Sequence, residues 1–207
     1  DLDNKRYFDV SIMGIGTNSL GYCNEEVDRA VIENIKKSNL STFNCPEEVM
    51  LAEKLLEINP WADMVRLART GGEANAISIR IARAASGKDN VAICGYHGWH
   101  DWYLSVNHNN SGEDLSEHLL PGLKPEGVPA SLKNSVFPFT YNNYEELCKI
   151  VDDHKIGVIK MEVERNFKPE NKFLKKVRDL ASKKGIVLIF DECTSGFRET
   201  YGGIFKK

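Results

Sequence analysis

An apolar run that ends on two acids constrains the fold of this 207-residue chain more than any other stretch. The five residues 186–190 are all apolar, Gly185 precedes them, and Asp191 and Glu192 follow. Such a run is typical of a strand buried on both faces of a parallel sheet. Ligands of open α/β sheets bind beyond the carboxyl ends of the strands, so we expect Asp191 at a ligand site. The alternative is that Asp191 only caps the turn that follows.

Strand and helix patterns alternate from residue 64 onward. The expected strands are 64–68, 91–94, 135–137, 156–163 and 186–190. The expected helices are 73–85, 144–154 and 170–184, and a long irregular loop covers 107–133. This alternation predicts an α/β fold with a parallel sheet covered by helices. A loop of that length in a compact domain is expected to be functional or mobile.

The first 60 residues have a different pattern. Residues 3–12 suggest an edge hairpin that leads into a glycine-containing loop. A helix is expected after Asn24, which would cap it, and a second helix is expected to begin at Pro46.

Composition excludes several classes of protein. The net charge is −3 with acids and bases interspersed, which argues against a nucleic-acid partner. No apolar run approaches the roughly 20 residues of a membrane span, and the N-terminus lacks the pattern of a signal peptide. The five cysteines are widely spaced without a Cys-x-x-Cys pair, which favours reduced thiols in a cytoplasmic protein and no structural zinc. The abrupt ends, Asp1 and Lys207, suggest a fragment of a longer chain.

Two glycines between an expected strand and helix suggest a phosphate site. In Thr70-Gly71-Gly72, the glycines would let the backbone approach a ligand, and the helix start offers N–H groups and a positive dipole end. Thr70 would add a hydroxyl. The alternative is that the glycines only make a tight turn, and the dinucleotide pattern G-x-G-x-x-G is absent.

A second candidate is the aromatic turn 95–103. Its aromatic side chains could stack on a planar ligand, or they could simply pack together. A metal site on His97, His100 and Asp101 is a further alternative, without the spacing of a known zinc motif. A third candidate is the expected strand end from Lys160 to Asn166, where Glu162 should line the same crevice as Asp191. The alternative there is a solvated cluster of acids and bases.

A phosphate-binding turn, aromatic side chains that can stack on a ring, and a carboxylate at a strand end together suit one kind of ligand. Pyridoxal phosphate needs its phosphate anchored, its ring stacked, and a carboxylate that keeps the pyridine nitrogen protonated.

The order of the motifs along the chain strengthens this interpretation. They are Asp3-x-x-x-Tyr7-x-Asp9 with Gly14-x-Gly16, Thr70-Gly71-Gly72-Glu73-Ala74, Tyr96-His97-Gly98-x-His100, Glu162 with Arg165-Asn166, and Asp191-Glu192-x-x-x-Gly196-Phe197-Arg198. With them the sequence resembles the class III, fold-type-I pyridoxal-phosphate aminotransferases, most closely the branch of glutamate-1-semialdehyde aminomutase.

The resemblance implies which residues bind the cofactor. Gly71 and Gly72 would hold the phosphate, Tyr96 would stack on the ring, Asp191 would pair with the pyridinium nitrogen, and Cys193 would pack on the opposite ring face. The full implied set is Thr70, Gly71, Gly72, Tyr96, His97, Glu162, Asn166, Asp191 and Cys193. The family commonly has Ser-Gly-Thr in its phosphate loop and an aliphatic residue, often Val, at the ring-packing position, so Thr-Gly-Gly and Cys193 depart from its pattern.

The resemblance also implies a domain division and a function. Residues 1–45 would belong to the small domain and its dimer contacts, and residues 46–207 to a cofactor-binding large domain that is incomplete at its C-terminus. The parent would be a homodimer that moves an amino group between a small-molecule amino donor and a carbonyl acceptor. The family's Schiff-base lysine would follow after Lys207, because Lys206 and Lys207 come too early. The alternatives are a non-catalytic cofactor-binding or dimerisation fragment and, without G-x-G-x-x-G, a weakly supported nicotinamide-dependent oxidoreductase.

Overall fold

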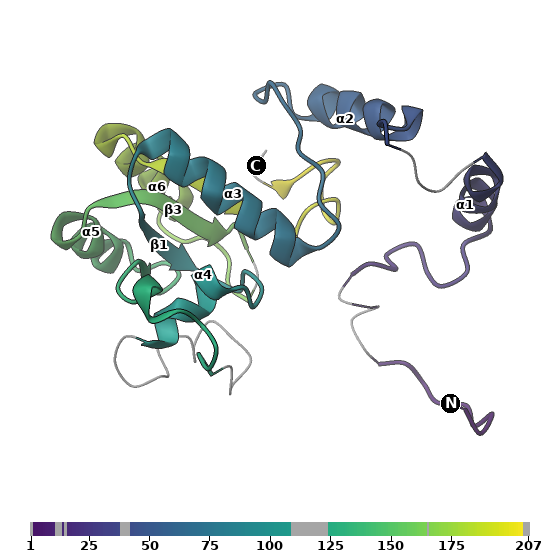
Figure 1. Ribbon diagram of the computed structural model, residues 1–207, viewed down its shortest axis with the longest axis horizontal. Coiled ribbons are helices and arrows are strands. Elements are labelled where there is room, and N and C mark those ends of the chain that lie inside the picture. Colours follow the sequence, from purple (N-terminus) through teal and green to yellow (C-terminus); the bar gives the residue numbers. More distant parts are fainter. Residues whose placement is uncertain are drawn as a thin grey trace. The chain divides into compact units, whose positions relative to one another are not determined.

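The structure is a computed structural model, and it describes residues 2–10, 14, 16–37, 42–108, 124–164 and 166–204. The chain divides into two compact units, Asp1–Val65 and Arg66–Lys207. The second unit contains the sheet (Figure 1), and most of the buried residues belong to it.

The first unit contains the two helices that the sequence predicts. Helix α1 (Glu25–Lys37) begins after Asn24, whose Oδ1 accepts a hydrogen bond of 3.1 Å from the Val27 N–H. An asparagine at this position satisfies one of the backbone donors that a helix start leaves without an internal acceptor. Helix α2 (Pro46–Ile58) has Pro46 in its first turn, where the missing N–H costs nothing. Both predicted helix starts are confirmed.

Two expected strands of the N-terminal part are wrong within the described residues. Residues 2–10 form no strand, and Ile12 lies outside the described residues. Residues 64–68 also lack a strand. The described ladders all join residues between 90 and 191, so neither segment belongs to one of them. An apolar stretch becomes a strand only where a partner strand exists.

The second unit has the predicted parallel sheet. Its strands are β1 (Asn90–Cys94), β2 (Val136–Pro138), β3 (Ile156–Glu162) and β4 (Val187–Asp191). They lie in the order β2-β1-β3-β4, and each neighbouring pair is parallel. In the register of β3 and β4, Glu162 lies opposite Asp191. The carboxyl ends of these two strands therefore meet at one edge of the sheet.

Helices cover both faces of this sheet (Figure 1). Helix α3 (Gly71–Ser86) and the short helix α4 (Asp101–Leu104) pack on one face, with Val91 and Ile93 of β1. Helices α5 (Tyr144–Asp153) and α6 (Phe173–Lys184) pack on the other, with Ala92 and Cys94. Neighbouring residues of a strand point to opposite faces, which explains this division. Two 3₁₀ turns, Ser105–His108 and Ala130–Leu132, complete the described elements.

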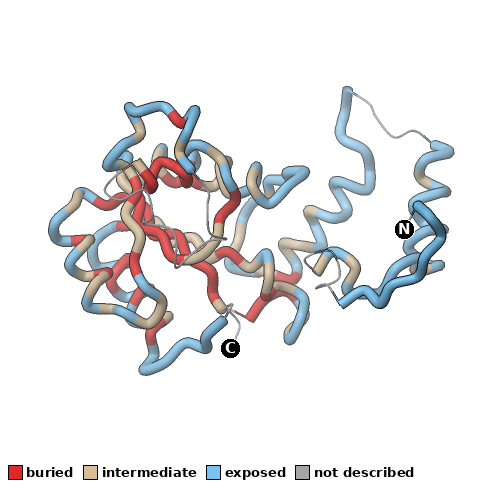
Figure 2. Tube along the Cα trace, turned by 90° about the horizontal axis from the view of Figure 1, so that it is seen from below, coloured by how far each residue is buried: buried red, intermediate tan, exposed pale blue. Residues whose placement is uncertain are grey.

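The burial of the strands differs from the expectation in one respect. All seven residues of β3 are buried, and four of the five in β1, so these strands form the centre of the sheet (Figure 2). In β4 only Asp191 is buried and residues 187–190 are half-buried, because β4 is the last strand in the described sheet. The expected burial on both faces is therefore wrong for residues 187–190, whereas Ile186 is buried, and the strand assignment is confirmed for β4.

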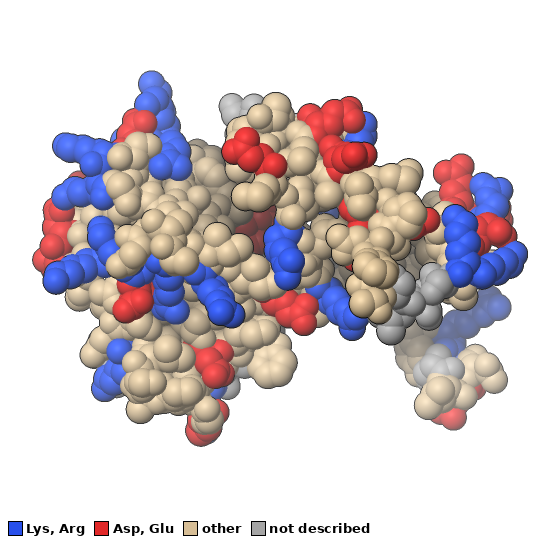
Figure 3. Space-filling view, turned by 45° about the horizontal axis from the view of Figure 1, so that its top comes forward, with Lys and Arg blue, Asp and Glu red and all other residues tan. Residues whose placement is uncertain are grey.

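On the face drawn in Figure 3, Lys and Arg are interspersed with Asp and Glu, in keeping with the small net charge. None of the helices in the described ranges is long and apolar enough to cross a membrane.

Candidate functional site

Asp191 lies at the carboxyl end of β4 and makes contacts in two directions. Its Oδ1 accepts a hydrogen bond of 3.0 Å from the Cys193 N–H, so Asp191 does cap the following turn. Its Oδ2 lies 2.9 Å from Nδ1 of His97 and 3.9 Å from Nζ of Lys160. The two interpretations of Asp191 are thus compatible, because each uses a different carboxylate oxygen.

Asp191 is held in its ionised form. Only 8% of the residue is exposed, and this burial opposes ionisation. The hydrogen bond from His97 and the positive charge of Lys160 outweigh the burial and lower the pKa of Asp191 from 3.8 to about 2. A buried carboxylate that stays charged suits a cationic ligand group.

His97 supports Asp191 from inside the protein. The residue is fully buried, and its second ring nitrogen, Nε2, lies 3.1 Å from the carbonyl oxygen of Cys94. Both ring nitrogens thus face acceptor oxygens, and only a protonated ring could donate to both at once. Burial lowers the pKa of His97 and so opposes that protonated form. Sequence reasoning grouped His97 with the cofactor-binding residues; the geometry gives it contact with Asp191, and a direct contact with a cofactor stays a prediction.

Glu162, at the end of β3, connects the loops that follow β1 and β4. It is 5% exposed. Its Oε2 accepts a hydrogen bond of 3.1 Å from the Tyr96 N–H after β1, and its Oε1 lies 3.5 Å from Oγ1 of Thr194 after β4. A Cβ on Gly95 would come within 2.4 Å of Oε2, and Gly95 has a φ of +105°, so glycine is required there. Glu162 therefore lines the predicted crevice.

Lys160 is a site residue that sequence reasoning did not single out. It is 1% exposed, and its Nζ lies 3.4 Å from Oγ of Ser78 on α3 as well as 3.9 Å from Oδ2 of Asp191. The interpretation of 160–166 as a solvated cluster is wrong for Lys160 and Glu162. The available signal was a single lysine inside the apolar strand 156–161, since a lysine in a buried strand needs a charged or polar partner.

Thr70 and the two glycines form the start of α3. The Thr70 hydroxyl accepts a hydrogen bond of 3.1 Å from the Glu73 N–H, and a Glu73 carboxylate oxygen accepts one of 3.0 Å from the Arg69 N–H. The first bond is an N-cap, and the second resembles the return bond of a capping box but ends on the N–H of the residue before the cap. Thr70 is thus explained as a helix cap, and its contact with a phosphate stays a prediction. The N–H groups of Gly71 and Gly72 lie in the first turn, where a helix offers no internal acceptors.

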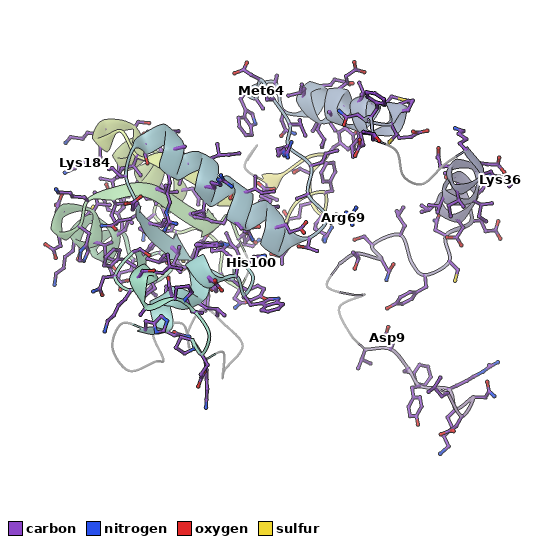
Figure 4. All side chains as sticks on the ribbon, viewed as in Figure 1. Asp9, Lys36, Met64, Arg69, His100 and Lys184 are labelled. Carbon is purple, nitrogen blue, oxygen red and sulfur yellow. The ribbon has the colours of Figure 1, made fainter. Side chains whose placement is uncertain are left out.

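The glycines meet different neighbours. A Cβ on Gly72 would come within 2.6 Å of Cε1 of His100, so glycine at 72 allows this ring to pack against the start of α3 (Figure 4). Nδ1 of His100 is buried and lacks a hydrogen-bond partner among the described residues. A Cβ on Gly71 would meet only Sγ of Cys193, at 3.7 Å. The start of α3 therefore lies close both to an unsatisfied ring nitrogen and to the turn after Asp191.

The aromatic turn after β1 is a packed cluster. The Tyr96 and Tyr103 rings meet edge to face at 6.2 Å, and the His97 and Trp102 rings are stacked at 6.4 Å. Tyr103 and Trp102 are buried, so packing explains these two aromatic side chains. Tyr96 is only half-buried, and stacking on a ligand stays a prediction for it.

The remaining predicted residues lie on the surface. Cys193 is exposed beside Gly71, and Asn166 is exposed in the segment after β3. Arg165 lies outside the described residues, as do Lys206 and Lys207. In the described ranges no group of three or more His, Cys, Asp or Glu side chains is arranged to hold a metal ion.

Comparison with known proteins identifies relatives over the full length of the chain. Residues 1–205 match the family model described as aminotransferase class-III. The 3-aminobutyryl-CoA aminotransferase of Cloacimonas acidaminovorans is 34% identical over 219 residues, which cover 100% of this chain and 47% of that protein. The glutamate-1-semialdehyde 2,1-aminomutase of Archaeoglobus fulgidus is 30% identical, over 98% of this chain and 48% of that protein. The chain spans about half the length of these curated relatives.

Solved structures share the fold. An omega-transaminase from Sphaerobacter thermophilus superposes with a TM-score of 0.76 at 27% identity, over 90% of this chain and 44% of that chain. The ornithine aminotransferase of Toxoplasma gondii has a TM-score of 0.76 at 20% identity, over 95% and 47% of the two chains.

Proposed function

Because the chain belongs to the class-III aminotransferase family, we propose that it forms the cofactor-binding part of an enzyme that moves an amino group between an amino compound and a carbonyl compound. The family match confirms the resemblance found in the sequence motifs. The cofactor is pyridoxal 5′-phosphate, which supplies an aldehyde for amine condensation and an electron-withdrawing ring.

The observation that carries the proposal is the buried, ionised carboxylate of Asp191. Its Oδ2 is oriented by His97 at 2.9 Å, and Oδ1 is fixed by the Cys193 N–H at 3.0 Å. A carboxylate held in this way can keep a ring nitrogen protonated, which strengthens the ring as an electron acceptor. We assign Asp191 that role.

The start of α3 fits a phosphate group. The N–H groups of Gly71 and Gly72 and the positive end of the helix dipole attract an anion. The buried Nδ1 of His100, next to Gly72, lacks a partner in the described structure, and a phosphate oxygen would satisfy it. We propose that these groups, with Thr70, bind the phosphate.

The ring would lie between these two anchors. The half-buried Tyr96 is proposed to stack on one ring face and the exposed thiol of Cys193 to pack on the other. Glu162 would hold the Tyr96 backbone in place through its 3.1 Å hydrogen bond, and Asn166 would lie near the ring edge.

Substrate choice is proposed only as a class. The activity would be that of a transaminase or of an aminomutase like glutamate-1-semialdehyde aminomutase, because relatives of both kinds match with similar identity. The substrates would be a small-molecule amino donor and a carbonyl acceptor, with no nucleic acid or membrane partner.

Residues 1–45 are proposed to contribute to the small domain and to dimer contacts, with residues 46–207 as the large domain. Helix α1 exposes Val31, Ile32 and Ile35 at 51%, 52% and 60% of their areas, which favours burial against a second copy of the chain. Light scattering should give a dimer that Val31→Lys weakens and the neighbouring Glu33→Lys does not. We also propose a cytoplasmic location, supported by five free cysteines.

The test is binding of pyridoxal phosphate to the protein. Absorbance titration before and after borohydride, followed by mass spectrometry, should show saturable binding that Asp191→Ala weakens at least tenfold, while Asp152→Ala on the exposed end of α5 binds as wild type does. A reduced adduct on one lysine would support catalysis, and binding without an adduct would support the fragment alternative. Absence of saturable binding would refute the proposed function.

A further inference from the structure

Lys160 is buried in the site without a role in the proposed function. It lies in the middle of β3, on the face that α3 covers, and 1% of it is exposed. A lysine is almost never buried to this extent unless it is paired. Its Nζ has two described neighbours, Oγ of Ser78 at 3.4 Å and Oδ2 of Asp191 at 3.9 Å.

The charged groups around Lys160 all belong to the site. Asp191 on β4 and Glu162 on β3 carry negative charges that favour the charged form of Lys160, and α3 contributes only the neutral Ser78 at this contact. Burial lowers the pKa of His97, the other neighbour of Asp191, and so disfavours a positive charge on its ring. Lys160 therefore places a buried ammonium group beside the Asp191 carboxylate in the free protein.

Asp191 has capacity for one more cationic partner. A carboxylate has about four lone-pair sites, and the described contacts of Asp191 are those with Cys193, His97 and Lys160. A protonated ring nitrogen that approaches Asp191 would share the carboxylate with the Lys160 ammonium. Two positive charges a few ångströms apart in a buried site repel each other.

We propose that Lys160 is a positioning residue that shares the Asp191 carboxylate with the ring nitrogen of the bound cofactor, so that its charge weakens the binding of a protonated ring. This inference rests on the proposed function. It also predicts how binding responds to pH. Burial lowers the pKa of Lys160 to about 8, so the opposing charge should disappear as the pH rises through that value.

The experiment compares wild type with Lys160→Met, which keeps the length of the side chain and removes the charge. The probe is pyridoxamine 5′-phosphate, because it has no aldehyde that would react with surface lysines. Below about pH 8, Lys160→Met should bind the probe roughly ten- to thirtyfold more tightly than wild type. Above this pH the two dissociation constants should converge. The ionisation of the probe affects both dissociation constants equally at a given pH, so it does not change their ratio.

A matched control is Lys175→Met, since Lys175 is exposed and pairs with Asp179 at 2.6 Å. Its dissociation constant should follow that of wild type at every pH. A ratio for Lys160→Met that stays near one, or that does not change with pH, would overturn the inference and indicate a purely structural lysine.

A second measurement does not need the cofactor. The ¹³C carboxyl signal of Asp191 in the wild-type protein should show a second step near pH 8, where Lys160 loses its proton, and Lys160→Met and Lys160→Gln should lack this step. Absence of the step in wild type would refute the pairing even if neither variant folds. If no variant binds the probe, the proposed function and the sharing of the carboxylate both fail, while a pH 8 step would still establish the ion pair.

Discussion

Replacing Asp191 with asparagine should destabilise the protein through the loss of one buried charge. The introduced asparagine keeps an oxygen for the Cys193 N–H, but its neutral amide NH₂ would face the Lys160 ammonium, which can only donate. The difference between 3.8 and about 2 in the pKa of Asp191, at about 1.36 kcal/mol per unit, gives about 2.5 kcal/mol. We therefore expect Asp191→Asn to lower the unfolding free energy by about 2–3 kcal/mol near pH 7.

The pH dependence of this loss has a defined sign. The pKa of Asp191 is lower in the folded protein, so its stabilising effect is present above about pH 4 and is lost as the pH falls toward 2. The difference between wild type and Asp191→Asn should shrink over this range. Urea unfolding followed by circular dichroism measures it, as long as both proteins unfold in a single transition.

The ion pair can be tested in the same assay by a double-mutant cycle. Combining Asp191→Asn with Lys160→Met should cost less than the sum of the two single changes, because the double variant leaves no buried lysine without its partner. The control is Asp152→Asn, which removes an exposed acid that pairs with Lys184 and should unfold at the wild-type urea concentration. Additive single changes, or a loss for Asp191→Asn no larger than for Asp152→Asn, would refute the argument.

Three further predictions concern the same site. Gly72→Ala should lose about 1–3 kcal/mol of unfolding free energy and most cofactor affinity, since its methyl group would displace His100; wild-type unfolding and binding would contradict this. Because burial lowers the pKa of Lys160 from 10.5 to about 8, the unfolded chain binds more protons in this range, and stability should rise between these pH values by up to about 3 kcal/mol in wild type but not in Lys160→Met. If urea unfolding gives the same change of unfolding free energy with pH in wild type and in Lys160→Met, this prediction is refuted. Thr70→Ala should cost about 1 kcal/mol by removing the cap on Glu73, and Thr70→Ser should restore it in the same assay; equal loss in both variants would contradict the cap.

The elements of the sheet could be predicted because their signals are local. The apolar run before Asp191 and the expected helix between 73 and 85 depend on periodicity within one segment, and both are confirmed as β4 and α3. The expected strand at 64–68 has a similar local pattern, yet it has no ladder partner among the described residues. Pairing is a property of two segments, which a single stretch of sequence does not contain.

The candidate site could be predicted in outline for the same reason. Strand ends carry their acids at fixed places, so Glu162 and Asp191 could be assigned to one edge. The contact of Lys160 with Asp191 depends on the relative register of β3 and β4 and on the approach of Ser78 from α3, and neither can be read from the strand alone. The capping role of Thr70 was also missed, although Thr70 and Glu73 have the spacing of a capping box.

The alternation of side chains across the sheet separates two kinds of mutational effect. Lys160 and Asp191 share their strand faces with Val158 and Ile189, which pack toward α3, whereas the face toward α5 and α6 is an apolar core. Conservative apolar exchanges under α5 and α6 should therefore alter how readily the protein unfolds and leave the charges around Asp191 unchanged. Related proteins can therefore differ in thermal stability through substitutions on the face under α5 and α6, while the charged site on the α3 face stays the same.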